Sequence, residues 1–249
     1  MNEMRLSRDP IWLARDMRQE FYIPDDMPVS LDILIKEKKI FYKEVPLPAG
    51  YLGASRTVGL KKEVLVSNQI KDSGRKKFTI AHELGHVFLH QGSYRCKSSF
   101  MSLAFNKIPQ ETEANIFASE LLMPGAILRE TAENKDITVE LAKNISGTYE
   151  TSLQSALMGL IKASPDIVCA CCYTREKVLW NIKSMGCTYE LRTKARWPTA
   201  VGMGINKAVP ESWFIDDEFP DDTYCLEENY IYPGGIYCLS IISLQSEEF

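Results

Sequence analysis

The three histidines of the chain all lie in one short stretch, FTIAHELGHVFLH, at residues 78–90. His82 and His86 are four residues apart and Glu83 follows the first, which gives the pattern H-E-x-x-H. In an α-helix, residues four apart share one face and are separated by about 6 Å along the axis, so both imidazoles can reach a single metal ion. This spacing predicts an amphipathic helix that carries a metal site.

Each residue type in the motif suits a role at a zinc site. Neutral imidazole nitrogen is a common zinc ligand. Glu83 is poorly placed to join both histidines at the ion, but it can hold a water molecule and take its proton. We therefore predict His82 and His86 as metal ligands and Glu83 as the catalytic acid and base of a zincin-like hydrolase. Zn²⁺ is the expected ion, with Mn²⁺ or another divalent ion as alternatives, and no organic cofactor is predicted.

A catalytic zinc needs a third protein ligand and a position open to water. His90 lies eight residues after His82, about 12 Å along a helix axis, so one ion cannot gather all three histidines from an intact helix. We predict His90 to be a residue of the helix end. The third ligand is expected from a second helical segment, QETEANIFASELLM, at residues 110–123.

Two glutamates of that segment compete for the role of third ligand. The stripe that faces the histidine helix begins at Glu111 and continues at spacings of three and four residues. Glu113 is turned about 200° from Glu111 around a helix, which directs it toward solvent. The spacing favours Glu111 over Glu113, and it places Asn115 one turn later, where its side chain could hydrogen-bond to a metal ligand.

Changes in composition and hydrophobic periodicity divide the chain into three parts, and its predicted fold class is α+β. Residues 1–126 form a zincin-like metallopeptidase domain with the active-site helix and a small sheet. Residues 127–163 are helical, with two periodic segments flanking Gly147 in the manner of a helix-turn-helix. Residues 164–249 read as a separate C-terminal α+β module, because strand-like runs such as IVCACCYT follow Pro165.

Local signals add three expectations near the motif. Thr79 is a plausible N-cap of the histidine helix. The stretch with Gly92, Ser93, Ser98 and Ser99 reads as a loop. Before the motif, two short segments rich in β-branched or aromatic residues, IFYKEVPL and EVLVSNQI, read as strands.

Composition excludes several classes of protein. With 45% hydrophobic residues, 25% charged residues and a net charge of −4 in 249 residues, the chain is an ordinary globular protein without a basic excess for nucleic acid. Its seven cysteines are odd in number. Three of them lie in the strand-like Cys169-Ala-Cys-Cys172 and the others are scattered, which favours buried reduced thiols. The first residues lack a secretory signal and no apolar run is long enough to cross a bilayer, so a cytoplasmic location is expected.

The run RKKFTIAHELGHVFLH, followed by E-T-E-A-N-x-F-A-S-E-L-L-M-P, resembles the ImmA/IrrE-type metallopeptidases over roughly residues 64–124. The resemblance implies His82, His86 and Glu111 as zinc ligands and Glu83 as the catalytic acid and base. It also implies that the strand EVLVSNQI lies where such enzymes have an edge strand for an extended peptide. The order of segments is similar to radiation-response members, which implies a GAF-like, sensor-type C-terminal module.

Members of this family cut helix-turn-helix repressors, often of the Xre type. The resemblance therefore implies a zinc-dependent endopeptidase that cleaves such a repressor and so derepresses stress-response or mobile-element genes. The alternative is a regulator that does not cleave, and that binds DNA or a repressor partner through the helical segment at residues 127–163. The intact H-E-x-x-H argues against it, because a purely structural zinc has no need of Glu83.

Overall fold

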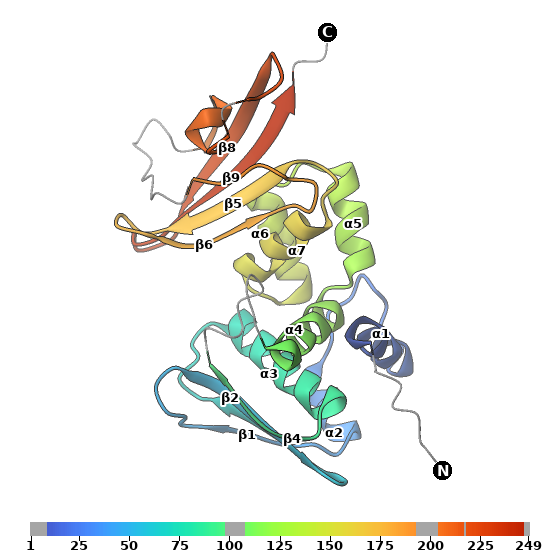
Figure 1. Cartoon of the computed structure of the whole chain (residues 1–249). Coiled ribbons are helices and arrows are strands. Elements are labelled where there is room, and N and C mark those ends of the chain that lie inside the picture. The colour runs from blue at the N-terminus through green and yellow to red at the C-terminus, as the bar shows by residue number, and fades with distance from the viewer. Residues whose placement is uncertain (1–8, 98–107, 193–203, 217, 247–249) are drawn as a thin grey trace. The chain divides into compact units, whose positions relative to one another are not determined.

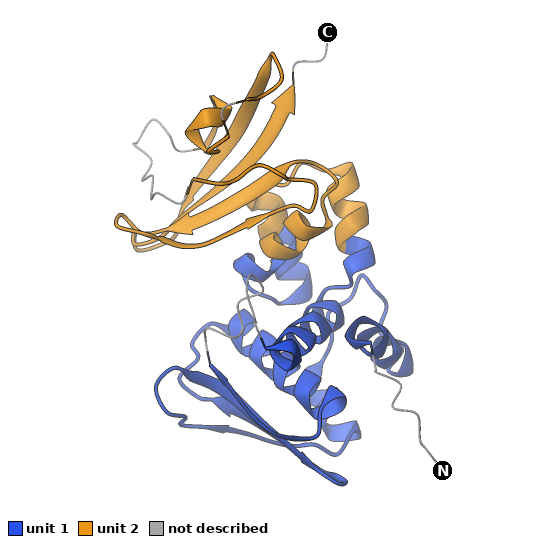
Figure 2. Ribbon diagram, in the orientation of Figure 1, with its two compact units in different colours: residues 1–127, 144–156 blue, residues 128–143, 157–249 orange. Residues whose placement is uncertain are grey.

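The computed structural model describes residues 9–97, 108–192, 204–216 and 218–246. Helices and sheets both occur, so the predicted α+β class is confirmed (Figure 1). The chain divides into two compact units (Figure 2): residues 1–127 with 144–156, and residues 128–143 with 157–249. The boundaries between them fall inside helices α5 (Gly125–Asn134), α6 (Val139–Tyr149) and α7 (Leu153–Ala163). The three-part division at residues 126 and 163 stays a prediction.

The first unit combines a four-stranded sheet with four helices. The strands are β1 (Phe41–Val45), β2 (Tyr51–Val58), β3 (Lys61–Ser67) and β4 (Gly92–Lys97), in the order β1-β3-β2-β4. β1 runs parallel to β3, and the other pairs are antiparallel. The helices are α1 (Pro10–Glu20), α2 (Leu31–Glu37), α3 (Ser73–Leu89) and α4 (Pro109–Leu122), and α3 packs against β2, β3 and α4.

Helix α3 carries the histidine motif, and it begins earlier than the sequence signals suggested. Its N-cap is Asp72, whose carboxylate accepts a hydrogen bond of 2.6 Å from the backbone N–H of Arg75. The expectation of a cap at Thr79 is wrong, because Asp72 is an equally good cap seven residues upstream and the helix already continues through Thr79. The Thr79 hydroxyl instead donates to the carbonyl of Arg75 within the helix, at 2.9 Å.

The segment after α3 is a strand where the sequence predicted a loop. Gly92 has φ of 113°, a conformation that suits glycine, and from there β4 pairs antiparallel with β2. Ser98 and Ser99 lie outside the described residues. The expected edge strand is also corrected: β3, which holds most of EVLVSNQI, lies between β1 and β2, and β4 is at the edge.

The second unit is built on a five-stranded antiparallel sheet in the order β6-β5-β9-β8-β7. Its strands are β5 (Val168–Tyr173), β6 (Val178–Lys183), β7 (Gly204–Ala208), β8 (Thr223–Ile231) and β9 (Cys238–Ser246), with a short 3-10 helix, η2 (Pro210–Ser212). All six residues of β5 are buried, which explains its continuous apolar sequence. The seven cysteines of the chain are free and buried.

The turn between α6 and α7 does not lie at Gly147, as the sequence suggested. Gly147 is inside α6, and the chain reverses three residues later at Glu150, which has φ of 54°. DNA binding by this pair of helices stays a prediction.

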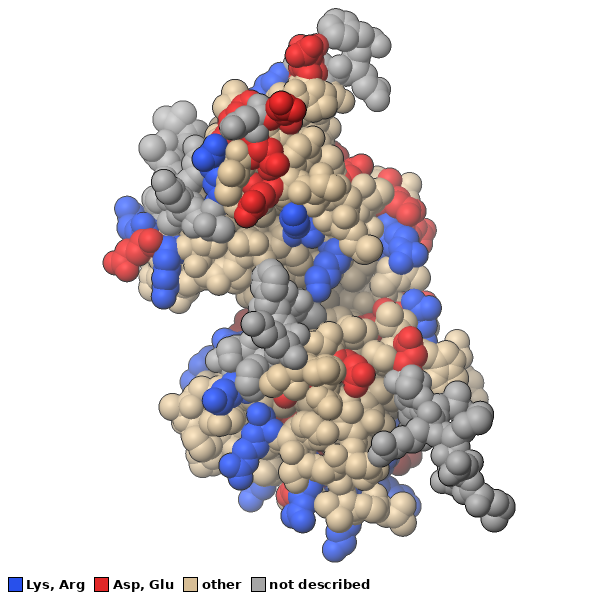
Figure 3. Space-filling view, in the orientation of Figure 1, with Lys and Arg blue, Asp and Glu red and all other residues tan. Residues whose placement is uncertain are grey.

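The surface shows no dominant charge of either sign in the view of Figure 3, where acidic and basic side chains both lie over each unit. This agrees with the modest net charge of −4. Within the described residues, no helix combines the length and the apolar character needed to cross a membrane.

Arg18 is a buried cation that ties α1 to the end of α4. Its side chain is 2% exposed and donates to the carbonyl of Leu121 at 2.7 Å. It also donates to the carbonyls of Pro24 and Met27. A guanidinium is suited to this position, because its rigid fork of donors can satisfy several carbonyls at once.

Replacing Arg18 by Met should lower the free energy of unfolding by about 3 kcal/mol, because buried carbonyls lose a charged donor. Arg15→Met is the matched control. Arg15 pairs with Glu120 at 2.6 Å but its side chain is 56% exposed, so its loss should cost less than about 1 kcal/mol. Urea denaturation measures both values. Equal losses in the two variants would contradict this role of Arg18.

Candidate metal centre

The site lies where α3 and α4 approach each other closely. A Cβ added at Gly85 would lie 3.0 Å from the Cα of Ala114 and 3.1 Å from its carbonyl oxygen. Glycine and alanine at this crossing therefore let the two backbones come together. As a result, the histidines of α3 and the first turn of α4 face each other across a short gap.

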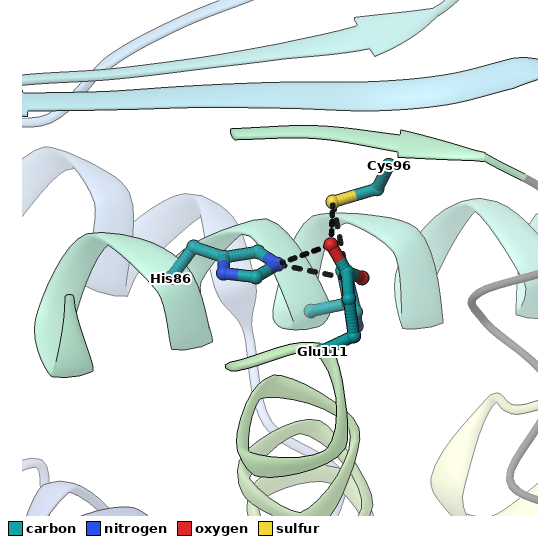
Figure 4. Close-up of side chains that lie close together, drawn as sticks. His86, Cys96 and Glu111 are labelled. Carbon is teal, nitrogen blue, oxygen red and sulfur yellow. Dashed lines mark hydrogen bonds and ion pairs between the residues drawn. The ribbon is translucent and has the colours of Figure 1, made fainter. Parts of the chain in front are cut away.

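Side chains from three elements converge at this gap. His82 and His86 come from α3, Glu111 from α4 and Cys96 from β4, and Figure 4 shows the last three pointing toward one another. The potential ligand atoms of the four residues all lie within 4.8 Å of one another, and all four residues are buried. The structure thus brings the predicted residues together and adds Cys96, which the sequence reasoning missed.

The distances between donor atoms are short and similar. The Nε2 atoms of His82 and His86 are 3.2 Å apart. The Glu111 carboxylate lies 3.2 Å from Nε2 of His82 through Oε2, and 3.6 Å from Nε2 of His86 through Oε1. The Cys96 Sγ is 3.2 Å from His82 Nε2 and 3.8 Å from Glu111 Oε1.

Hydrogen bonds on the far side of each imidazole can fix its tautomer. His82 Nδ1 lies 2.8 Å from Oδ1 of Asn115, where the ring N–H donates to the amide oxygen. His86 Nδ1 lies 3.0 Å from Nδ1 of His90, whose Nε2 is 2.8 Å from Glu113. With a hydrogen on each of these Nδ1 atoms, both Nε2 lone pairs face the gap. Asn115 therefore lies where the sequence placed it.

His90 and Glu113 stand outside the cluster of donors. His90 is the C-cap of α3, as predicted, and its backbone N–H donates to the carbonyl of His86. Its ring centroid is 5.2 Å from that of His86, which is in turn 4.8 Å from that of His82. Glu113 is 48% exposed, so Glu111 is the glutamate beside the two histidines.

This donor set fits a zinc ion. In a tetrahedral site with bonds of about 2.0–2.1 Å to nitrogen and about 2.3 Å to sulfur, neighbouring donors are about 3.3–3.7 Å apart. The separations between 3.2 and 3.8 Å at this site are close to those values. In addition, Oε2 of Glu111 is buried without a hydrogen-bond partner, although His82 Nε2 is near. Lone pairs that converge without enough protons between them indicate a cation site.

Glu83 is completely buried beside this cluster. Neither of its carboxylate oxygens has a hydrogen-bond partner. Burial raises the pKa of Glu83 to about 7, although the charge of His82 and the nearby Cys96 thiol and Ser55 hydroxyl act in the opposite direction. The carboxylate lies under β2, where a Cβ on Gly53 would clash with it. Glycine at this position of the strand leaves room for the acid.

The other titratable groups respond to burial and to each other. Burial acts to raise the pKa of Glu111, but the neighbouring His82 and His86, in their protonated form, outweigh it and lower that pKa to about 2. Burial lowers the pKa of His86, which favours the neutral imidazole that a metal requires. Burial, with the charges of Glu83 and Glu111, raises the pKa of the Cys96 thiol well above its usual range.

Cys96 reaches the site because β4 is a strand. Alternate residues of a strand share a face, so Tyr94 and Cys96 both turn inward while Ser93, Arg95 and Lys97 are exposed. The Tyr94 ring stacks on His86 with centroids 4.4 Å apart and an interplanar angle of 11°. The alternation of buried and exposed residues in this segment could have revealed Tyr94 and Cys96. It was missed because the segment was predicted to be a loop.

Comparison with known proteins points to one family. The model of a peptidase family described as "IrrE N-terminal-like domain" matches residues 36–160, half of the chain. The radiation response metalloprotease IrrE of Deinococcus radiodurans is 28% identical over 104 residues, which are 41% of this chain and 32% of that protein. The chain thus matches about a third of the length of this curated relative.

One solved structure resembles nearly the whole chain. It is a Mycobacterium tuberculosis transcriptional regulator, with a TM-score of 0.54 over 96% of this chain and 76% of that one. The sequence identity is 12%, so the likeness concerns the fold alone.

Gly85→Ala should separate α3 from α4, because the added methyl group meets backbone atoms. We expect a loss of about 1–3 kcal/mol in the free energy of unfolding. Zinc affinity measured by competition with a chromogenic chelator should also fall. Gly147→Ala, in α6 with open space around it, is the control and should be neutral or stabilising by up to about 1 kcal/mol. Unchanged zinc affinity in Gly85→Ala would contradict this account of the helix crossing.

Asn115→Ala should weaken zinc binding by about 10–100-fold, because His82 loses the acceptor that fixes its tautomer. The same chelator competition gives the affinity, and circular dichroism shows whether the fold persists. Asn134→Ala, which removes an exposed side chain on α5, should leave zinc affinity as it is. A folded Asn115→Ala protein with wild-type affinity would show that His82 does not depend on this contact.

Proposed function

Because the chain belongs to the peptidase family of the IrrE N-terminal-like domain, we propose that it is a zinc-dependent endopeptidase with a zincin-like catalytic domain. In this proposal His82, His86 and Glu111 hold the ion, and Glu83 is the catalytic acid and base. Mn²⁺ or another divalent ion is the alternative to zinc. The observation that carries the proposal is the convergence of these three donors beside a buried glutamate without a partner.

The chemistry follows from the chain's own groups. A divalent ion held by the three donors would supply Lewis acidity, which acidifies water and polarises a carbonyl oxygen. Glu83 accepts a proton from the attacking water and returns it to the amide nitrogen of the leaving peptide. Its complete burial suits this exchange, because a carboxyl whose pKa is about 7 can both take and give a proton near neutral pH.

The substrate is proposed to bind along β4. β4 pairs with β2 on one side, and within the described residues it is one of the two edge strands of the sheet, the other being β1. An extended peptide can add to such an edge through backbone hydrogen bonds. Since Tyr94 and Cys96 of the same strand face the donors, a peptide on this edge would run past the proposed catalytic site.

The proposed substrate is a helix-turn-helix repressor of the Xre type, whose cleavage would derepress stress-response or mobile-element genes. This substrate class rests on the resemblance of residues 64–124 to ImmA/IrrE-type peptidases. Two further parts of the proposal are a helix-turn-helix-like pair formed by α6 and α7, and a GAF-like sensor module after residue 163. The rival proposal is a regulator that binds DNA or a repressor without cutting it.

A Glu83→Gln variant should bind zinc like the wild type and lose peptidase activity by at least about 100-fold, because the amide cannot exchange the proton. The assay incubates the zinc-loaded protein with a helix-turn-helix repressor encoded beside its gene and detects fragments by mass spectrometry. Fragments should disappear when a chelator is added.

Glu133→Gln is the matched control for this substitution, since Glu133 is exposed on α5. It should retain both zinc and cleavage. Full cleavage by Glu83→Gln would remove Glu83 from the reaction. An intact repressor that binds the wild-type protein, or a gel shift with DNA, would favour the rival proposal.

A further inference from the structure

The strand β4 places a fourth donor at the candidate metal centre. The Cys96 Sγ is 3.2 Å from Nε2 of His82 and 3.8 Å from Oε1 of Glu111. Its side chain is fully buried, and among the described residues it is the one cysteine of the cluster. Two nitrogens, one carboxylate and one sulfur within 4.8 Å of one another are donors of the kinds and the number that a four-coordinate zinc site uses.

The backbone holds this thiol in place. Cys96 pairs with Gly53 of β2 in the antiparallel register, and Tyr94 of the same inward face stacks on His86. The thiol is therefore directed at the donors by the sheet and by a neighbouring ring contact. A cysteine on a mobile surface segment would lack both the strand pairing and the neighbouring ring contact.

A site with four protein ligands is closed to water, and closed zinc sites are usually structural. Glu83 argues against a purely structural role here. Its carboxylate is fully buried and both oxygens lack partners, an arrangement that costs stability and gives nothing to a structural ion. The site therefore holds both a general base that needs water and a thiol that takes the position of that water.

We propose that Cys96 is a fourth metal ligand that holds the peptidase in a closed, latent state, so that activity requires its withdrawal from the ion. This inference rests on the proposed function, because latency has meaning only for a site that can cleave. β4 is suited to such a movement: it pairs only with β2 among the described strands, and the register shifts between Tyr51 and Gly53, beside the partner of Cys96. A small displacement of this strand end would withdraw the thiol from the ion.

The test uses the full chain loaded with Co²⁺ in place of zinc, because a thiolate ligand gives cobalt a near-ultraviolet charge-transfer absorption. We expect one bound cobalt and this absorption in the wild type, and loss of the absorption in Cys96→Ser. Cobalt affinity should fall in Cys96→Ser by more than about 100-fold, the upper end of the loss expected when a residue that only hydrogen-bonds to a ligand is removed. Cys169→Ser is the matched control. Cys169 and Cys187 both belong to the second unit, and their Sγ atoms are 3.4 Å apart, so this pair could also bind cobalt through thiolates. The absorption should persist in Cys169→Ser if it arises from Cys96.

A second measurement asks whether the coordination position is open, and it does not depend on catalysis. Acetohydroxamate, a small metal-binding probe, should change the visible spectrum of the Cys96→Ser cobalt protein and leave that of the wild type unchanged at the same concentration. Repressor cleavage by the zinc form should be several-fold faster in Cys96→Ala than in the wild type.

The outcomes separate this inference from the proposed function. A wild-type protein that binds one cobalt without the thiolate absorption, or that binds acetohydroxamate as well as Cys96→Ser does, would overturn the role of Cys96 and leave the peptidase proposal standing. Absence of bound metal in the wild type, or an intact repressor after incubation with both the wild type and Cys96→Ala, would overturn the peptidase proposal itself. Because the wild-type absorption needs no variant, a poorly folded Cys96→Ser protein does not block the test.

Discussion

The close crossing of α3 and α4 is the contact on which the candidate site depends. Because Gly85 has no side chain, the backbone of α3 lies against Ala114, and the first turn of α4 reaches the face that carries His82 and His86. A larger residue at either position would separate the imidazoles from Glu111. Two small residues therefore set the distances among the proposed ligands, although neither can bind a metal.

Hydrogen bonds to the Nδ1 atoms of the two imidazoles make this group of side chains a candidate cation site. When Nδ1 of His82 donates to Asn115 and Nδ1 of His86 donates to His90, the Nε2 atom of each ring has no hydrogen and faces the gap. These two Nε2 atoms are 3.2 Å apart. Such lone pairs repel one another unless a positive charge lies between them. Metal binding is therefore expected to add to the stability of the folded first unit, as in other sites whose ligands are gathered by folding.

The sequence predicted those parts of the site that depend on helical periodicity. A spacing of four residues places His86 on the same face of α3 as His82, and Asn115 on the same face of α4 as Glu111. Cys96 and the edge position of β4 depend on which strands pair, and that is decided by contacts between distant segments. The boundaries between the two units also could not be predicted from the sequence. They fall within helices, and the hydrophobic periodicity of a helix continues across such a boundary without a break.

The row of three rings along α3 has a practical consequence. His82, His86 and His90 follow one another at centroid separations of 4.8 and 5.2 Å, and the chain has no other histidine. Every imidazole resonance in a proton NMR spectrum of this protein therefore originates at the helix end that faces Glu111 and Glu113. Ion occupancy and ring tautomers can therefore be followed through three imidazoles of a single helix, with no imidazole signal from elsewhere in the molecule.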